Sequence, residues 1–329
     1  MSGARVLVTG ASGFLGGHVA RDLQEHGHEV FAAGRRVDAL ASVADAAHRI
    51  PGDLASLRPR DLEVDAVIHC AALSTPWGPW RAFHEANVQG TADVVEFVRR
   101  NRVRRLVHVS SPSVYAAARD HEQIRENEVD PRNRLNGYIR SKIAAEALLQ
   151  DAHRAGDVDE LVIVRPRGLI GVGDPSLVPR LLDVHARLGV PVFDGGRTLI
   201  DVTAVQNVAS ALRLSLTRGD ARGGVYNITN DDPREFRDLL VQLLGLLGET
   251  PRLRPLNRRL AWAAAATLEG VHRVLPGRPE PSFTRYTLST IAFSQTLDIT
   301  RAKDELGYGP EVSLDEALAD VAADLKARS

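Results

Sequence analysis

The sequence predicts an α/β fold in which a doubly wound parallel sheet is joined to a smaller, mainly helical C-terminal domain. Short β-branched runs alternate with helical apolar patterns through the first half of the chain, as in βαβ units. A glycine-spaced turn joins the first strand to the first helix, and beyond about residue 230 helices with proline-rich joints predominate. We expect residues 1–165 and about 198–230 to form the sheet domain, and about 166–197 and 231–329 to form the helical domain.

The composition excludes several classes of protein. The 329 residues suffice for a large core, and 41 Lys and Arg against 42 Asp and Glu argue against a nucleic-acid-binding surface. Cys70 is the only cysteine, which excludes internal disulfides and a zinc site of several thiolates and favours a cytoplasmic location. The strand at Arg5–Thr9 begins too early for a signal peptide, and we expect no membrane span. The longest apolar stretch, Leu260–Leu275, predicts a packed or substrate-covering helix.

The first element is a buried strand over Arg5–Thr9, followed by Gly10, Gly13 and Gly16 and by a helix expected over Phe14–His26. In such a turn the first glycine permits the sharp bend, the second lets a pyrophosphate approach the backbone, and the third lets helix and strand pack closely. Unpaired N–H groups at the start of the helix attract the anion. A turn without ligand is the alternative, but this context favours a dinucleotide-binding Rossmann fold.

The second strand, expected over His28–Ala33, ends at Gly34, Arg35 and Arg36. An acidic side chain at this place accepts a hydrogen bond from the ribose of NAD, whereas arginine neutralises the 2′-phosphate of NADP. No acid stands there and two arginines follow, so we predict NADP(H) as the preferred cofactor, with NAD(H) possible. A solvated surface pair is the alternative.

Two small-residue motifs follow a helix expected over Val37–Ala47. Asp53, in a Pro-Gly-Asp-Leu turn, is suited to bond an adenine amino group or simply to cap the turn. The strand Ala66–Cys70 meets Ala71 and Ala72, which suit a flat ring or ribose lying across the sheet edge, or ordinary tight packing.

Two tryptophans and one asparagine stand out in the next stretch. Trp77 and Trp80 lie in a proline- and glycine-rich loop, where they suggest an apolar lid over a substrate or rings packed on their neighbours. A long helix is expected over Phe83–Arg100, with Asn87 in its interior. Because asparagine is neither helix-favouring nor easily buried, its amide should make specific hydrogen bonds.

A serine-rich turn and a Tyr/Lys pair follow. The strand Arg104–Ser110 leads to Ser111, and a later helix opens with Tyr138 and Lys142, which share one face four residues apart. Such a pair is common on surface helices, so its meaning depends on its context. The remaining strands are expected over Leu161–Arg165 and Val225–Thr229, and the remaining helices over Val178–Leu188, from Val205, and over Phe236–Leu247, Arg285–Ala292 and Leu314–Leu325.

Six short motifs occur in one order and at fixed separations: Thr9–Gly16, Gly52–Leu54, His69–Ala72, Asn87–Thr91, Val109–Tyr115 and Tyr138–Lys142. With them the chain resembles the extended short-chain dehydrogenase/reductase family over nearly its whole length. LVIVRPRGLIGVGD and LIDVTAVQNVA are similar to the 3β-hydroxysteroid dehydrogenase group. STPWGPW and PSLVPRL most resemble bacterial 2-alkyl-3-oxoalkanoate reductases, which act in olefin biosynthesis.

The resemblance implies hydride transfer between a nicotinamide and a carbonyl carbon. Negative charge builds on the carbonyl oxygen during this step, so a proton donor must stand beside it. Tyr138 is expected as general acid/base, Lys142 as its electrostatic partner, and Ser111 as a hydrogen-bond donor to the substrate oxygen. Asn87 is expected to hold a water relay behind Lys142.

The resemblance also implies a cofactor site, a substrate site and a homodimer formed through the Asn87 and Tyr138 helices. No metal ligands are expected, since no His, Asp and Glu residues have ligand spacing, and the histidines are read as surface or packing residues. The expected cofactor residues are Gly10, Ser12, Gly13, Phe14, Leu15, Gly16, Arg35, Arg36, Asp53, Leu54, Ala71, Ala72, Tyr138, Lys142, Pro166 and Arg167. The expected substrate residues are Trp77, Trp80, Ser111 and Tyr138.

The sequence therefore predicts an NADP(H)-dependent oxidoreductase acting on a small hydrophobic ketone or alcohol, steroid-like or a β-keto or β-hydroxy acid. Pro112 and Ser113 stand where related dehydratases carry an Asp-Glu pair, which argues against dehydration. Gly168 stands where many epimerases carry asparagine. A nucleotide-sugar epimerase or ketoreductase and a non-catalytic NADP-sensing protein stay open as alternatives.

Overall fold

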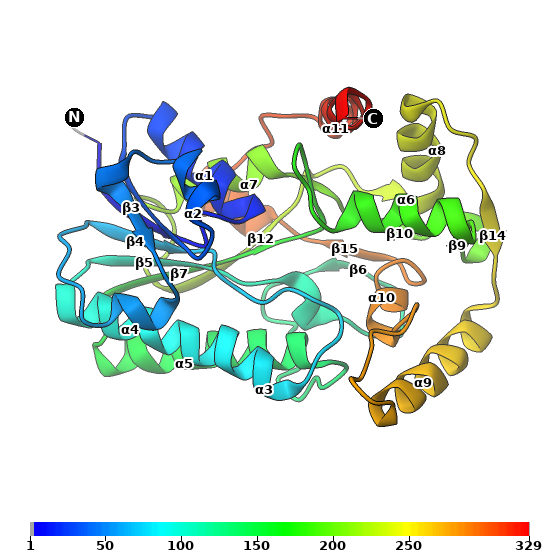
Figure 1. The fold of residues 1–329 in the computed structure, drawn as a ribbon, viewed down its shortest axis with the longest axis horizontal. Coiled ribbons are helices and arrows are strands. Elements are labelled where there is room, and N and C mark those ends of the chain that lie inside the picture. Colours follow the sequence, from blue (N-terminus) through cyan, green and yellow to red (C-terminus); the bar gives the residue numbers. More distant parts are fainter. Residues whose placement is uncertain (1–2, 329) are drawn as a thin grey trace.

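The computed structural model of the chain describes residues 3–328. Its centre is a seven-stranded sheet in which all neighbouring strands are parallel, as the sequence predicts (Figure 1). The strands lie in the order β12 (Arg222–Ile228), β7 (Glu160–Pro166), β5 (Arg105–Val109), β4 (Ala66–His69), β1 (Arg5–Thr9), β2 (Glu29–Gly34) and β3 (Arg49–Pro51).

Helices cover both faces of this sheet, which is why its strands are apolar throughout. In β1, the side chains of Val6 and Val8 pack with α1 (Phe14–Glu25) and α7 (Val205–Leu214), and Leu7 packs on the opposite side with α4 (Gly90–Asn101) and α5 (Gly137–Ala155). Figure 1 shows these two helical layers above and below the sheet. The result is a doubly wound fold with two separate cores.

The edge strand β12 comes from a much later part of the chain than the other strands of the sheet. The sequence predicts it over Val225–Thr229, and β12 spans Arg222–Ile228 and pairs in parallel with β7. Between β7 and β12 the chain forms α6 (Leu177–Arg187) and α7, so this edge of the sheet depends on residues far from the first six strands.

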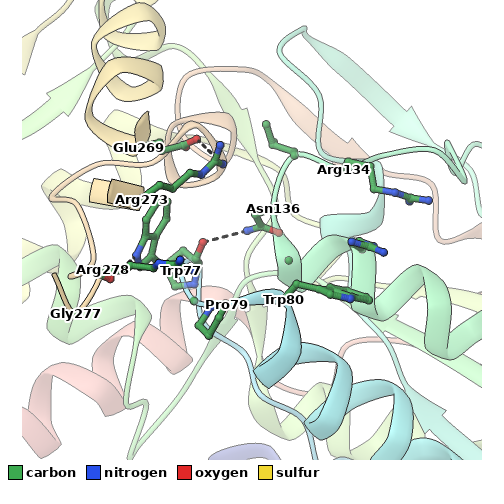
Figure 2. A pocket seen from close by; sticks show the side chains of 14 residues that line it. Trp77, Pro79, Trp80, Arg134, Asn136, Glu269, Arg273, Gly277 and Arg278 are labelled. Carbon is green, nitrogen blue, oxygen red and sulfur yellow. Dashed lines mark hydrogen bonds and ion pairs between the residues drawn. The ribbon is translucent and has the colours of Figure 1, made fainter. Parts of the chain in front are cut away.

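The remaining elements gather at one end of the sheet (Figure 1). A cavity lies at this end, between the start of α5 and the end of the helix α9 (Arg258–Val274) (Figure 2). Among the described residues, none of the helices combines the length and the apolar character that a membrane crossing needs. The helices are α6, α8 (Phe236–Leu247), α9 (Arg258–Val274), α10 (Arg285–Ser289) and α11 (Leu314–Arg328), and the small sheets are β13–β10–β15–β6 (Arg234–Glu235, Leu199–Ile200, Gln295–Leu297, His121–Ile124), β11–β8 (Thr203–Ala204, Leu169–Ile170) and β14–β9 (Leu253–Pro255, Val190–Val192).

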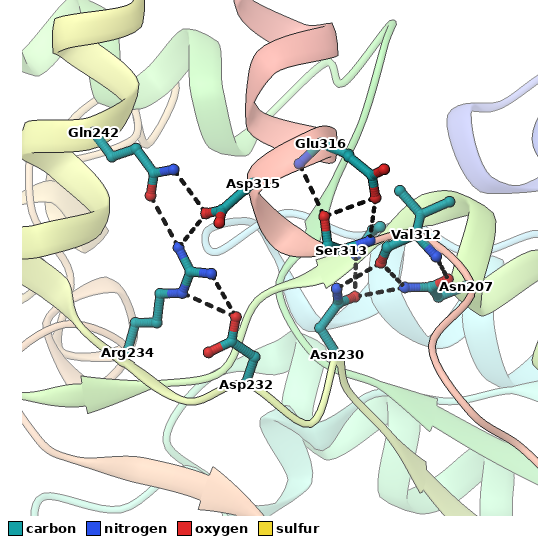
Figure 3. A network of polar contacts seen from close by, with 10 residues as sticks. Asn207, Asn230, Asp232, Arg234, Gln242, Val312, Ser313, Asp315 and Glu316 are labelled. Carbon is teal, nitrogen blue, oxygen red and sulfur yellow. Dashed lines mark hydrogen bonds and ion pairs between the residues drawn. The ribbon is translucent and has the colours of Figure 1, made fainter.

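A buried amide network ties the C-terminal segment to the sheet (Figure 3). The side-chain oxygen of Asn207 accepts hydrogen bonds from the backbone N–H groups of Glu311 and Val312, both at 2.9 Å. The side-chain amides of Asn207 and Asn230 both donate to the Val312 carbonyl, at 2.7 and 2.9 Å. These bonds fix the entry to α11, which packs its apolar face on α8.

Two predicted helices differ from the structure. The helix expected over Val37–Ala47 ends after one turn as α2 (Val37–Ala41), because Ser42 bonds back to the Ala39 carbonyl and Asp45 caps a separate 3₁₀ turn. The helix expected over Phe83–Arg100 starts earlier, with α3 (Trp80–Phe83), and contains a π-helical segment over His84–Gln89 before α4.

Candidate active site

The carboxyl ends of β1 and β4 meet where the strand order reverses, the usual place for a ligand in such sheets. Gly10, directly after β1, has a φ of +71°, and a Cβ there would lie 2.8 Å from the Cα of Ala71. A Cβ on Gly16 would lie 2.2 Å from the Gly10 carbonyl oxygen. Both positions therefore need glycine, in agreement with the roles that the sequence suggests for them.

The helix that follows this turn has no side chain that caps its N-terminus. Gly13 is its N-cap residue, no side chain accepts from its first amides, and its first turn contains no acid. The first amides of a helix have no partner within it, so those of Phe14, Leu15 and Gly16 can bind an anion. The turn thus fits the diphosphate of a dinucleotide cofactor, with Ser12 at its outer edge.

Exposed charged residues stand beside the turn. Arg35 and Arg36 follow β2, and the Arg36 guanidinium donates to the carbonyl oxygen of Ser12. A carboxylate oxygen of Asp53 accepts from the backbone N–H of Ser56 at 3.0 Å, so this residue caps a 3₁₀ turn as the simpler interpretation has it. Leu54 in that turn packs against Gly90, where a Cβ would lie 2.7 Å from its side chain.

Tyr138 and Lys142 lie on one face of α5, near its start. Asn136 caps this helix by accepting from the N–H of Ile139 at 2.8 Å. The Lys142 ammonium is buried and donates to the Val109 carbonyl at the end of β5, at 2.7 Å. Within the described part of the chain, the Tyr138 hydroxyl makes no hydrogen bond. Its oxygen is available to a ligand, whereas the lysine is held in place.

The Lys142 ammonium is destabilised by its surroundings. Burial lowers the pKa of Lys142 to about 8, and the negative charge of Glu146 opposes this shift without cancelling it. Because unfolding restores the ordinary pKa, the unfolded chain binds more protons than the folded chain between pH 8 and 10.5.

This shift predicts a pH dependence of stability in the cofactor-free protein. From Lys142 we expect a free energy of unfolding that rises with pH from about 8 to 10.5, and no contribution to the slope below that window. Urea unfolding of the wild type and of Lys142→Met across this range measures it. The free energy of unfolding of the variant should not show this rise between pH 8 and 10.5. If the free energies of unfolding of the two proteins changed with pH in the same way, the lowered pKa of Lys142 would be contradicted.

Ser111 follows β5, at the start of a 3₁₀ turn, within a chain of hydroxyl groups. Its hydroxyl donates to the Ser113 hydroxyl at 2.9 Å, and Ser113 is 2.7 Å from the Tyr286 hydroxyl. The neighbouring Ser110 instead donates to Glu146, which forms a buried ion pair with Arg165. Of the serines in this turn, Ser110 is therefore the one whose hydroxyl bonds to this ion pair.

The amide of Asn87 is fully engaged, as its place in a helix interior predicts. Its oxygen accepts from the N–H of Leu73 at 2.6 Å, and its nitrogen donates to the Leu73 carbonyl at 3.1 Å and to the Ser141 hydroxyl at 2.8 Å. These bonds join the loop after β4 to α5 beside Lys142. None of them reaches the ammonium itself, and the expected water relay stays a prediction.

Pro166 ends β7, and Arg167 follows it at the same edge of the sheet. Both are buried, and the Arg167 guanidinium donates to the side-chain oxygen of Gln295 at 3.2 Å. Burial lowers the pKa of Arg167 below its ordinary value, while the negative charge of Asp201 opposes the shift. No carboxylate forms an ion pair with this guanidinium among residues 3–328.

The two tryptophans line a cavity of about 620 Å³ with a polar wall (Figure 2). The guanidinium of Arg140 lies 3.7 Å from the centre of the Trp80 ring. The Trp77 indole N–H donates to the Arg278 carbonyl at 2.9 Å, and Arg273 lies 5.9 Å from its ring. Each tryptophan ring thus has an arginine neighbour, as expected for rings packed on their surroundings, and the apolar lid stays a prediction.

Two histidines are buried behind the site, and they agree with the packing interpretation. His69 bridges the hydroxyl groups of Thr9 and Thr91, at 2.7 and 3.2 Å, and burial lowers its pKa to about 3. The ring of His108 lies 5.1 Å from that of His69, and neither of its nitrogens has a partner in the part described. Across residues 3–328, no three His, Cys, Asp or Glu side chains are grouped to hold a metal ion.

Tyr286 is a site residue that the sequence analysis missed. Its ring lies 6.4 Å from that of Tyr138, and its hydroxyl is bonded to Ser113. Burial raises the pKa of Tyr286 to about 12, so it stays a neutral phenol. It comes from α10, nearly 150 residues after Tyr138 in the sequence, and no local pattern marks it.

The switch-point turn, the uncapped helix and the Tyr138–Lys142 pair are typical of nicotinamide-dependent α/β enzymes. A family model described as "Epimerase: NAD dependent epimerase/dehydratase family" matches residues 6–229. The chain belongs to this family, and this confirms the resemblance drawn from the motifs. It is an NAD(P)-dependent enzyme, an oxidoreductase or an epimerase.

Similar proteins include two named as a reductase or a dehydrogenase and one solved with a nucleotide sugar. Uncharacterized protein YbjS of Escherichia coli (strain K12) is 33% identical, with 98% of each chain covered. A 2-alkyl-3-oxoalkanoate reductase of Shewanella oneidensis is 31% identical over 98% of this chain and 86% of its own. The decarboxylating sterol-4-alpha-carboxylate 3-dehydrogenase of Mus musculus is 31% identical over 95% and 89%. The solved structure of MoeE5 in complex with UDP-glucuronic acid and NAD is 26% identical, with a TM-score of 0.76 and 99% and 100% coverage.

Proposed function

We propose that the chain is an NADP(H)-dependent oxidoreductase that interconverts a ketone and a secondary alcohol on a hydrophobic substrate. One observation carries this proposal. The Tyr138 hydroxyl makes no hydrogen bond within residues 3–328, and it stands one helical turn from a buried ammonium at the same sheet edge as the glycine turn.

The chemistry assigned to the chain is proton transfer and charge stabilisation. When bound, NADPH supplies the hydride. Tyr138 donates a proton to the carbonyl oxygen as charge builds there, and takes it back in the reverse direction. The ammonium of Lys142 stabilises the phenolate of Tyr138, and the Ser111 hydroxyl turns from Ser113 to the substrate oxygen. The bond between Ser113 and Tyr286 keeps Ser113 in place during that change.

Preference for NADP(H) is supported by Arg35 and Arg36, which are exposed beside the turn where the adenosine ribose would lie. Replacing both by serine removes charge-assisted hydrogen bonds worth about 1.5–3 kcal/mol each. We expect the KM for NADPH to rise by about 100-fold or more and the KM for NADH to change little. Arg328→Ser, at the end of α11, is the matched control. An equal rise for both cofactors would contradict the preference.

The substrate is proposed to be a β-keto or β-hydroxy acid. The names of two relatives, a 3-oxoalkanoate reductase and a 4-carboxylate 3-dehydrogenase, each place a carboxylate on the carbon next to the one oxidised or reduced. Arg167 is buried at this edge of the sheet and forms no ion pair within the described residues, so it is suited to bind that carboxylate.

A matched substrate pair tests this proposal. Initial rates with NADPH are measured on a 2-alkyl-3-keto acid and on the dialkyl ketone left by its decarboxylation. We expect Arg167→Gln to raise the KM for the acid by about 10-fold or more and to leave the KM for the ketone nearly unchanged. Equal effects on both substrates would remove Arg167 from carboxylate recognition. No turnover of either would contradict the oxidoreductase proposal.

The second candidate is a nucleotide-sugar epimerase or ketoreductase, favoured by the likeness to MoeE5 solved with UDP-glucuronic acid and NAD. Thermal-shift measurements with a panel of nucleotide sugars separate the two. The non-catalytic NADP-sensing alternative is weaker, because a sensor has no need of the Tyr138–Lys142 pair.

The proposal also assigns tasks to the two parts of the chain. Residues 1–165 and about 198–230 would bind the cofactor, and about 166–197 and 231–329 would shape the substrate site. A homodimer formed through α4 and α5 remains part of the proposal.

A further inference from the structure

Helix α9 presents an uncovered apolar face. Leu260, Val271 and Val274 are 72%, 48% and 83% exposed, and Leu268 and Leu275 are 37% and 40% exposed. Positions 260, 264, 267, 271 and 274 follow helical spacing, so these side chains form one outer face that carries no charge. Figure 1 shows α9 at the periphery, beyond both layers of the sheet domain.

The opposite face of α9 holds the helix in place. Ala265 and Glu269 are buried there, and the Trp262 ring packs edge-on against Phe293 at 5.9 Å. Glu269 accepts from the backbone N–H of Arg285 at 2.6 Å and from its guanidinium at 2.9 and 3.0 Å. The inner face thus anchors the helix, and the outer face has no packing role within the described chain.

The segment around this face is strongly basic. Residues 252–278 contain six arginines and a single acid, Glu269, whereas the whole chain has a net charge of −1. Exposed Arg259 flanks the outer face, and exposed Arg273 and Arg278 follow at its end. Figure 2 shows Arg273 and Arg278 on one side of the cavity and Arg134 on the other. Arg258 is paired with Asp120 and Asp194, and Arg273 with Glu269, whereas Arg259 and Arg278 form no ion pair among residues 3–328 and place positive charge beside the apolar face and the cavity.

We propose that α9 docks on the surface of an anionic lipid bilayer, with its outer face at the boundary of the acyl chains and the arginines on the phosphates. Interfacial helices combine an apolar face, low overall hydrophobicity and basic flanks in this way. The helix lies on the membrane and does not cross it.

The charge pattern favours a bilayer over a second copy of the chain. A twofold contact through α9 would bring the arginines of one copy against those of the other, whereas anionic headgroups accept all of them. The cavity, which ends at Asn136 and Gly137 directly before Tyr138, opens beside the same helix. The reason for docking rests on the proposed hydrophobic substrate, which would enter this cavity from the lipid.

Sedimentation with vesicles tests the docking directly. The full chain is mixed with vesicles of phosphatidylcholine alone or of phosphatidylcholine with phosphatidylglycerol. We expect binding only to the anionic vesicles, weakened by salt and by Arg259→Gln with Arg278→Gln. Leu260→Glu with Val274→Glu should reduce the bound fraction by about tenfold or more. The control is Val241→Glu, on α8, whose side chain is also exposed, at 44%.

The outcomes separate docking from catalysis. Thermal unfolding shows whether each variant is folded. Absence of binding to anionic vesicles, or equal loss with Val241→Glu, overturns the docking and leaves the oxidoreductase proposal untouched. Binding without turnover of any ketone supports the docking and contradicts only the oxidoreductase. If Leu260→Glu with Val274→Glu turns a dimer into a monomer and no vesicle binding occurs, the face belongs to a second copy and the proposal fails.

Discussion

Tyr138→Phe should lower kcat with NADPH and a ketone substrate by about 10²- to 10⁴-fold, the range that general acid catalysis contributes. The substitution removes one oxygen and keeps the ring, which packs between Phe83 and Tyr286. That oxygen has no hydrogen bond within residues 3–328, so its loss leaves no internal partner unpaired. The free energy of unfolding and the affinity for NADPH should therefore change little.

Steady-state rates, NADPH fluorescence titration and thermal unfolding measure these three quantities. Tyr308→Phe is the control, because it also removes a phenolic oxygen, one bonded to the Thr229 carbonyl at 2.8 Å outside the site. That variant should lose some stability and keep its activity. If Tyr138→Phe retained wild-type kcat, the proton donor would have to be another group.

Gly16→Ala should destabilise the protein and weaken NADPH binding, whereas Gly17→Ala should do neither. A Cβ on Gly16 would lie 2.2 Å from the Gly10 carbonyl oxygen, and backbone must move to admit it. A Cβ on Gly17 meets its nearest atom, the Ala11 oxygen, at 3.5 Å, which is ordinary contact. The two glycines are adjacent in α1, so the pair isolates the close approach from the effect of alanine on a helix.

For Gly16→Ala we expect a loss of about 1–3 kcal/mol in the free energy of unfolding, as for an overpacked core. Displacing the turn also misplaces the amides of α1, so NADPH affinity should fall by about tenfold or more. Gly17→Ala should be neutral or gain up to about 1 kcal/mol from helix propensity. Urea unfolding and NADPH titration measure both. Equal effects of the two substitutions would show that the turn is not tightly packed.

The sequence predicts well those features that depend only on residues close together in the chain. Gly10 and Gly16 are required by a turn of seven residues, and Tyr138 and Lys142 share a face because of helical spacing alone. The parallel arrangement of the strands follows from the alternation of strand and helix. These parts of the fold and of the candidate site need no information from distant segments.

Other features depend on tertiary contacts that no local pattern reveals. Tyr286 reaches Tyr138 from a short helix near the end of the chain, and the arginines over Trp80 and Trp77 come from two separate helices, α5 and α9. The sequence left open whether Asp53 bonds an adenine or caps a turn; the bond from Ser56 shows the cap, and the adenine contact stays a prediction. The stretch Leu260–Leu275 predicts a packed or substrate-covering helix, and the exposed Leu260 and Val274 of α9 become visible only in the structure.

The origin of β12 limits how the chain can be divided. Because this strand pairs with β7 from residues 222–228, a fragment ending near residue 165 would leave one side of β7 open along an apolar, otherwise buried strand. Such an edge is a template for pairing with other molecules, and it leads to aggregation. The nucleotide-binding half is therefore a poor unit for recombinant expression, and both halves should be produced as one polypeptide.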